Sequence, residues 1–174
     1  MRMRPYIERK DFKYIETWIH NEREHALWCA NCFPYPVTME SFHALLEKSA
    51  EEWEASAFVV VDDSGKVIGF FCYSVNLEND EGFLSFIIID SSLRGKGYGK
   101  QVIQLALRYA FDMTGAKLVQ LNVFEENINA KHCYEQLGFV NRNRAEDVFV
   151  YNDEVWNRHN MVITNSHLFL EHFC

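Results

Sequence analysis

The chain has 174 residues, 48% of them hydrophobic, and its formal net charge is −8. This length is enough for one domain with a real core, and the acidic balance argues against non-specific binding to nucleic acid or anionic membranes, which depends on basic surface. No apolar run approaches the roughly 20 residues of a membrane span, and five cysteines indicate reduced thiols, so we expect a cytoplasmic protein.

The N-terminal third is predicted to be helical. One helix is expected over residues 11–24, with Asp11 as its N-cap, and a break rich in aromatic residues and prolines follows at 29–37. A second helix is expected over 38–53, with Thr38 as its N-cap. Its predicted apolar face holds Phe42, Leu45, Leu46 and Ala50.

Strands and helices alternate along the rest of the chain. Strands are predicted at 57–61 and 67–73, joined by a hairpin turn, and at 83–89, where the apolar run is typical of a strand buried on both faces. An amphipathic helix is expected from Gly99, with Gly115 as its C-cap. We then expect a strand over 117–124, a short helix over 127–137 and a closing pair of strands over 148–151 and 155–163. This order predicts an α+β fold with a mixed sheet.

The glycine-rich turn at 94–99 lies between the buried strand and the amphipathic helix. Backbone N–H groups at such a turn point toward an anion, and Arg94, Lys96 and Lys100 add local positive charge. A P-loop would need Ser or Thr after Lys100, where Gln101 stands, and a dinucleotide-binding turn would need a further glycine. The turn therefore predicts a phosphate-bearing cofactor of another class.

Two motifs in order carry a resemblance to a known family. The turn fits Arg/Gln-x-x-Gly-x-Gly/Ala through Arg94, Gly97 and Gly99. A second motif, N-x-x-A-x-x-x-Y-x-x-x-G-F, is matched by Asn127, Ala130, Tyr134, Gly138 and Phe139. Over residues 56–163 the chain resembles the GNAT superfamily of acetyl-CoA-dependent N-acetyltransferases. This resemblance implies a GNAT-like fold, with a mixed, mostly antiparallel central sheet flanked by helices on both faces. It also implies one acetyltransferase domain over 1–174, with 165–174 as a C-terminal extension.

The resemblance also implies the contacts to acetyl-CoA. The pyrophosphate would lie on the turn and its backbone amides, formed by Arg94, Gly95, Lys96, Gly97, Tyr98, Gly99 and Lys100. Glycine at the turn lets phosphate approach a backbone without Cβ atoms. The pantetheine arm would pair with the backbone of Ile87, Ile88 and Ile89, and Asn127 would contact the cofactor.

Acetylation requires a neutral amine, a stabilised oxyanion and a proton for the departing thiolate. Backbone N–H groups around 87–89 can serve the oxyanion. Tyr134 matches the family tyrosine near the cofactor's sulfur and shares a helical face with Ala130 and Leu137, so it is the expected general acid. The alternative for Tyr134 is a core residue with a satisfied hydroxyl.

No general base is assigned from the sequence. Some family members have a glutamate five residues before the motif asparagine, but here Asn122 stands there and cannot take a proton at neutral pH. Glu125, Asp90 and Glu81 lie near the ends of predicted strands and are open candidates, or they are solvated surface charges. Asn122 also motivates an alternative function, a CoA-binding regulatory or interaction module without turnover.

The 29–37 segment has several open interpretations. Cys29 and Cys32 form a single CxxC near histidines, which is too little for zinc, and we expect no metal. Its aromatic neighbours Trp28, Phe33 and Tyr35 either shape an acceptor pocket for a cation or an apolar side chain, or fill core. The expected partners are acetyl-CoA and an amine acceptor, preferably a small molecule. Nucleic acid and membrane partners are not expected, and a homodimer is compatible with the sequence.

Overall fold

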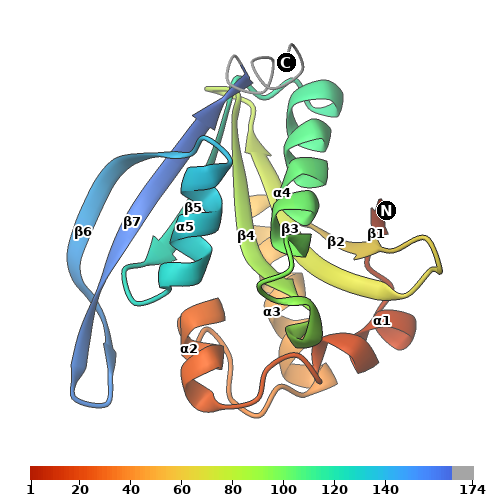
Figure 1. The fold of residues 1–174 in the computed structure, drawn as a ribbon, viewed down its shortest axis with the longest axis vertical. Coiled ribbons are helices and arrows are strands. Elements are labelled where there is room, and N and C mark those ends of the chain that lie inside the picture. Colours follow the sequence, from red (N-terminus) through yellow and green to blue (C-terminus); the bar gives the residue numbers. More distant parts are fainter. Residues whose placement is uncertain (166–174) are drawn as a thin grey trace.

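A seven-stranded mixed sheet organises residues 1–165, the part of the chain that the computed structural model describes (Figure 1). Its strands are β1 (Arg2–Pro5), β2 (Ser56–Val61), β3 (Val67–Asn76), β4 (Glu81–Ile89), β5 (Leu118–Phe124), β6 (Val140–Tyr151) and β7 (Glu154–Thr164). The spatial order is β1-β2-β3-β4-β5-β7-β6, and only β4 and β5 pair in parallel. The expected α+β fold with a mostly antiparallel sheet is confirmed.

Helices cover both faces of this sheet (Figure 1). On one face lie α1 (Glu8–Ile15), α2 (Glu22–Cys29) and α3 (Met39–Trp53), and on the other lie α4 (Tyr98–Arg108) and α5 (Ile128–Gln136). A 3₁₀ turn, η1 (Ser91–Leu93), precedes α4, and a π-helical turn, η2 (Tyr109–Met113), continues it. Because side chains alternate along a strand, Phe70 of β3 packs with α3 while Phe71 packs with α4.

The N-terminal prediction is wrong in two respects. The chain begins with an edge strand, β1, that the sequence did not indicate, and the single helix expected over 11–24 is two helices, α1 and α2. Asp11 does not cap a helix from outside. It lies buried within α1, where it accepts hydrogen bonds from both terminal nitrogens of Arg4 at 2.7 Å and from the Ile7 N–H at 2.8 Å. The ion pair with Arg4 of β1 therefore engages the side chain that the sequence pattern assigned to an N-cap.

The remaining elements agree more closely with the sequence. Thr38 caps α3 as predicted, although Ser49 rather than Ala50 is the buried residue of its last turns. The hairpin of β2 and β3, the strand before the glycine-rich turn and the 127–137 helix are confirmed. β6 begins at Val140, well before the expected 148, because its polar first half pairs with β7 despite two register shifts. The predicted extension at 165–174 lies outside the described residues, apart from Asn165.

The two parallel strands separate along their length. β4 and β5 pair only through residues 81–84 and 118–121, and Figure 1 shows them diverging toward α2. The register between β3 and β4 shifts between Phe70 and Cys72 of β3, and Phe86 of β4 adopts a φ of 50°. The divergence leaves the β5-facing edge of β4 open from Ser85 onward, next to the starts of α4 and α5. No helix within residues 1–165 is long and apolar enough to cross a membrane.

Candidate active site

Asp90 fixes the connection from β4 into the glycine-rich turn. Its buried carboxylate accepts hydrogen bonds from the Ser92 N–H at 2.9 Å and from Lys66 Nζ at 2.8 Å. Burial raises the pKa of Asp90, but these hydrogen bonds outweigh it and hold the pKa below its usual range. Asp90 is therefore ionised and fully engaged in holding the turn, which argues against the base role left open for it.

The turn itself presents open backbone. Gly95 and Gly97 adopt φ values of 73° and 83°, and a Cβ added at either would meet no atom within 4 Å. Gly97 is the N-cap of α4, so the N–H groups of Tyr98, Gly99 and Lys100 have no acceptor one turn earlier in the helix. Accessible, outward-pointing donors with no side chain above them suit the pyrophosphate of acetyl-CoA.

The basic side chains of the turn are less free than the sequence suggested. Arg94 donates from Nη2 to the Trp18 carbonyl oxygen at 2.6 Å, and its Nη1 lies 3.2 Å from Glu24 Oε2. Lys96 Nζ donates to the Ser92 carbonyl oxygen at 2.9 Å. Arg94 thus ties the turn to the N-terminal helical layer, and Lys96 is held against the main chain of the turn, so we expect backbone amides to be the main donors to an anion.

Three elements of the predicted site converge at Gly99. A Cβ built there would lie 3.7 Å from Ile89 Cδ1 on β4 and 3.7 Å from Cys133 Sγ on α5. Lys100 lies close enough to Cys133 for its charge to offset part of the burial that raises the pKa of that thiol. The predicted pantetheine strand, the pyrophosphate turn and the helix that carries Tyr134 are therefore neighbours.

The three isoleucines divide between the two cores. Ile87 and Ile89 pack against the core under α4, whereas Ile88 is buried in the opposite core. Their backbone lies on the part of β4 that is not paired with β5. This arrangement leaves main-chain groups available for the expected pantetheine contact while the side chains serve packing.

Tyr134 points inward from α5, as its helical face predicted. It is 7% exposed, its ring centroid lies 5.8 Å from that of Phe139, and no other residue within 1–165 hydrogen-bonds its hydroxyl. Burial, and to a lesser degree the neighbouring Cys133, raises the pKa of Tyr134, so the phenol stays protonated at neutral pH. A protonated, unengaged hydroxyl is suited to proton donation, and the catalytic role stays a prediction.

Asn127 has a structural function that the motif did not indicate. It is the N-cap of α5, and its Oδ1 accepts from the Ala130 N–H at 3.4 Å. Its Nδ2 donates to no other residue in the described part of the chain. The amide can therefore cap the helix and offer a donor to the cofactor at the same time.

Glu81, another candidate base, is ion-paired, and the uncharged Asn122 is hydrogen-bonded. Glu81 accepts two hydrogen bonds from Arg142, at 2.9 and 3.1 Å, and one from Gln120 at 2.9 Å. Asn122, at the family's glutamate position, is exposed on β5, and its Oδ1 accepts from Asn160 Nδ2 at 3.1 Å. None of these groups is placed to collect a proton freely.

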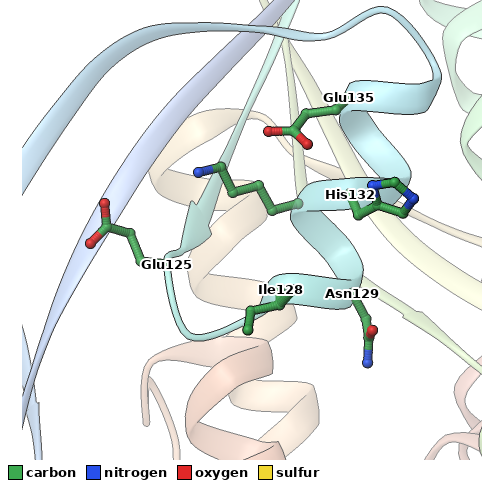
Figure 2. A pocket seen from close by; sticks show the side chains of 6 residues that line it. Glu125, Ile128, Asn129, His132 and Glu135 are labelled. Carbon is green, nitrogen blue, oxygen red and sulfur yellow. The ribbon is translucent and has the colours of Figure 1, made fainter.

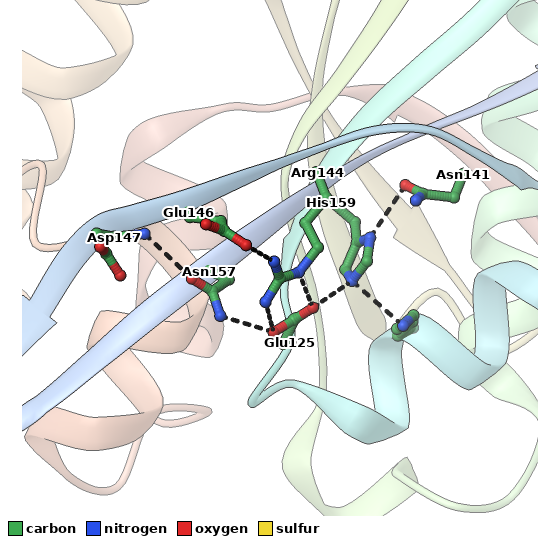
Figure 3. A network of polar contacts seen from close by, with 8 residues as sticks. Glu125, Asn141, Arg144, Glu146, Asp147, Asn157 and His159 are labelled. Carbon is green, nitrogen blue, oxygen red and sulfur yellow. Dashed lines mark hydrogen bonds and ion pairs between the residues drawn. The ribbon is translucent and has the colours of Figure 1, made fainter.

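Glu125 is the centre of a polar network at the end of β5, shown in Figure 3. It accepts from Arg144 Nε at 2.6 Å and from Asn157 Nδ2 at 2.8 Å, and its Oε1 lies 2.8 Å from His159 Nε2. Hydrogen bonds, that from Arg144 foremost, lower the pKa of Glu125 to about 2. A carboxylate of such low basicity is a poor general base at neutral pH.

Two surface cavities lie on elements that carry or adjoin the candidate site. Figure 2 shows one of about 400 Å³ on α5, lined by Glu125, Ile128, Asn129, Lys131, His132 and Glu135. The other, of about 570 Å³, lies between the loop after α2 and the tip of the β6–β7 hairpin, and Tyr35 and Tyr151 are among its lining residues. Neither is lined by Tyr134 or the glycine-rich turn. The second adjoins α2, which packs over β4.

Both interpretations of the aromatic residues around the 29–37 segment have support in the structure. Trp28 and Phe33 pack in the core, with ring centroids 5.7 Å apart. Phe33 and Tyr35 also line the cavity beside α2. Cys29 is buried with its Sγ 3.3 Å from His25 Nε2, and burial, followed by the charge of Cys32, raises the pKa of Cys29 to about 12. No group of three or more metal-ligating side chains occurs within residues 1–165.

A cation–aromatic contact near the second cavity could not be found from the sequence. The Arg23 guanidinium of α2 lies 5.1 Å from the ring centroid of Trp156 and 5.6 Å from that of Tyr151, and it pairs with Glu154. The contact joins α2 to the β6–β7 hairpin across more than a hundred residues of sequence. The pairing partners share no motif, and only the fold brings them together.

Known proteins show the same arrangement of elements. A family model described as Acetyltransferase (GNAT) family matches residues 23–139. A spermidine N(1)-acetyltransferase of Vibrio cholerae is 27% identical over 161 residues, which are 92% of this chain and 91% of the relative. The crystal structure of spermidine N-acetyltransferase from V. cholerae in complex with CoA and spermine has a TM-score of 0.79 and 27% identity, with 95% and 96% of the two chains covered.

A second structure of the V. cholerae enzyme is described as dodecameric and in an intermediate state. Its TM-score is 0.72 at 25% identity, and the match covers 99% of this chain and 97% of that one. The similarity therefore extends over nearly the whole length of both chains, including the N-terminal helices and the closing hairpin.

Proposed function

Because the chain belongs to the GNAT family and is an acetyl-CoA-dependent N-acetyltransferase of small amines, we propose that its acceptor is a polyamine of the spermidine type. The observation that carries this proposal is the near full-length similarity to a spermidine N-acetyltransferase that was crystallised with CoA and spermine. The net charge of −8 agrees with a cationic acceptor. Membership in an enzyme family also favours turnover over the alternative of a binding module.

We propose that the turn and the open edge of β4 hold the co-substrate. Backbone N–H groups from Gly95 to Lys100 would bind the pyrophosphate, and the main chain of Ile87, Ile88 and Ile89 would align the pantetheine arm. Asn127 would add a side-chain donor at the start of α5. Acetyl-CoA supplies the activated thioester, and these residues orient it toward the gap between β4 and β5.

The chemistry then depends on the groups around that gap. The neutral amine nitrogen forms a bond to the acetyl carbon, and the carbon–sulfur bond breaks as backbone N–H groups of β4 stabilise the oxyanion. Tyr134 gives its proton to the departing thiolate. With Asn122 uncharged and Glu81, Asp90 and Glu125 ion-paired, the proton that the nitrogen loses as the amide forms leaves to water, and water returns a proton to Tyr134.

A thiol-release assay tests the assignment. Purified protein, acetyl-CoA and a panel of amines should release CoA fastest with spermidine and spermine, and mass spectrometry should find one added acetyl group on the polyamine. Equal rates with monoamines, amino acids and aminoglycosides would refute a polyamine acceptor. Release with none of the amines would favour a module that binds CoA without turnover.

Two accompanying proposals concern the protein's setting. Because the V. cholerae enzyme has a dodecameric structure, self-association of this chain is proposed, and light scattering after gel filtration measures it. The cytoplasmic location expected from the sequence stays a prediction, which cell fractionation tests.

A further inference from the structure

Glu126 has one carboxylate oxygen that nothing in the described structure satisfies. Its Oε2 is buried and has no hydrogen-bond partner within residues 1–165. Buried polar atoms are almost always hydrogen-bonded, and a buried charge is costly unless it is paired. An exception of this kind in a folded enzyme calls for a ligand or a neighbour that completes it.

The residue lies in the short connection between β5 and α5. It follows the last residues of β5 and directly precedes Asn127, the N-cap of α5. Phe124, two residues earlier, packs with Trp156 of β7 and Ala26 of α2. Glu126 therefore stands between the helix that carries Tyr134 and the α2–hairpin contact, and it is not among the residues that line the nearby 570 Å³ cavity.

A neighbouring cation, Arg23, does not neutralise it. Hydrogen bonding to Glu154 is the main cause of the raised pKa of Arg23, and the charges of Glu154, Tyr151 and, last, Glu126 add to it. Glu126 is thus close enough for its field to reach Arg23. However, both terminal nitrogens of Arg23 bond to Glu154, and no ion pair within 4.0 Å joins Arg23 to Glu126.

Glu125 provides the contrast on the adjacent residue. Its carboxylate receives hydrogen bonds from Arg144 and Asn157 and contacts His159, so it has no remaining capacity for a ligand cation (Figure 3). The two neighbouring glutamates carry the same carboxylate group, but that of Glu125 is paired whereas Oε2 of Glu126 is not.

We propose that Glu126 binds a protonated, non-reacting amine of the acceptor and so makes the enzyme selective for molecules with more than one amine. This inference rests on the proposed function. A carboxylate stabilises an ammonium ion, whereas the amine that attacks must be neutral, so Glu126 suits the amine that is not acetylated. The half-buried ring of Tyr151, which lines the 570 Å³ cavity, adds an aromatic surface that attracts cations.

The test compares spermidine with n-hexylamine, a monoamine, in wild type, Glu126→Gln and the matched control Glu125→Gln. In Glu126→Gln, the kcat/KM for spermidine should fall roughly 10- to 100-fold, as expected for loss of a hydrogen bond to a charged group, while that for hexylamine changes little. The KM for acetyl-CoA should stay the same. Because the change removes an unpaired carboxylate whose Oε2 is buried, the Tm of Glu126→Gln should equal or exceed that of wild type.

The control separates substrate binding from general effects. Glu125→Gln should lose thermal stability through its broken network and keep the wild-type preference for spermidine. An unchanged preference in Glu126→Gln, with wild type selective for spermidine, would overturn this inference alone. A wild-type enzyme without preference for spermidine would refute the proposed function and this inference together. A lower Tm with equal losses on both amines would make Glu126 a structural residue and would also overturn the inference.

Discussion

Replacement of Gly97 by alanine tests whether the turn holds the pyrophosphate, and Gly65 supplies a matched control. Gly97 has a φ of 83° and Gly65, in the turn between β2 and β3, a φ of 86°. At both positions an added Cβ meets nothing within 4 Å. The two substitutions therefore impose the same backbone strain without a clash, and they differ only in what approaches the glycine.

The expected stability loss is the same for both variants. A left-handed conformation costs an L-residue about 1–2 kcal/mol. For a chain of this size, that corresponds to a fall in Tm of about 2–8 °C. Differential scanning fluorimetry without ligand should therefore give similar shifts for Gly97→Ala and Gly65→Ala.

CoA binding should separate the two variants. A methyl group above the amides of the turn would displace a phosphate and cost at least one charge-assisted hydrogen bond, about 1.5–3 kcal/mol. This is a rise in Kd of about 10- to 150-fold, measured by isothermal titration calorimetry with CoA. Gly65→Ala should bind CoA as wild type does. Equal affinities in the two variants would refute the assignment of the pyrophosphate to the 94–100 turn.

Three further predictions follow from particular contacts. Tyr134→Phe should lower kcat by roughly 10²–10⁴-fold in the thiol-release assay while Tm and CoA affinity stay near wild type, because the hydroxyl bonds to no described residue; unchanged kcat would exclude it as the acid. Burial raises the pKa of Asp11, but hydrogen bonds from Arg4 and from the main chain lower it overall, so its stabilisation is present above about pH 3.9 and is lost as the pH falls through the lowered value. Asp11→Asn should thus cost about 3–5 kcal/mol at pH 7 and progressively less below pH 4 in urea unfolding, and a pH-independent difference would contradict this. In Arg144→Ala, carbon NMR should find the pKa of Glu125 raised from about 2 toward its usual 4.5, whereas no change would show that Arg144 is not the dominant partner.

Local sequence was sufficient for the elements that carry their own signals. The turn around Gly97, the hairpin after Val61, the Thr38 cap and the motif from Asn127 to Phe139 each depend on residues within a few positions of one another. Glycine conformation, side-chain capping and helical periodicity act over that range. These signals determined the fold class and the family, and with them the co-substrate.

Only the tertiary structure decided which charges are free. Arg94 looked like a phosphate ligand, yet its guanidinium bonds to Trp18 and Glu24, and Asp11 looked like a cap, yet it pairs with Arg4. The sequence offered three glutamate or aspartate candidates for the base and overlooked Glu126. Whether the carboxylate of Glu125 or of Glu126 is paired depends on residues of strands and a helix that are distant in the chain. A carboxylate's role is set by the groups that the fold places around it, and those contacts leave no local pattern to read.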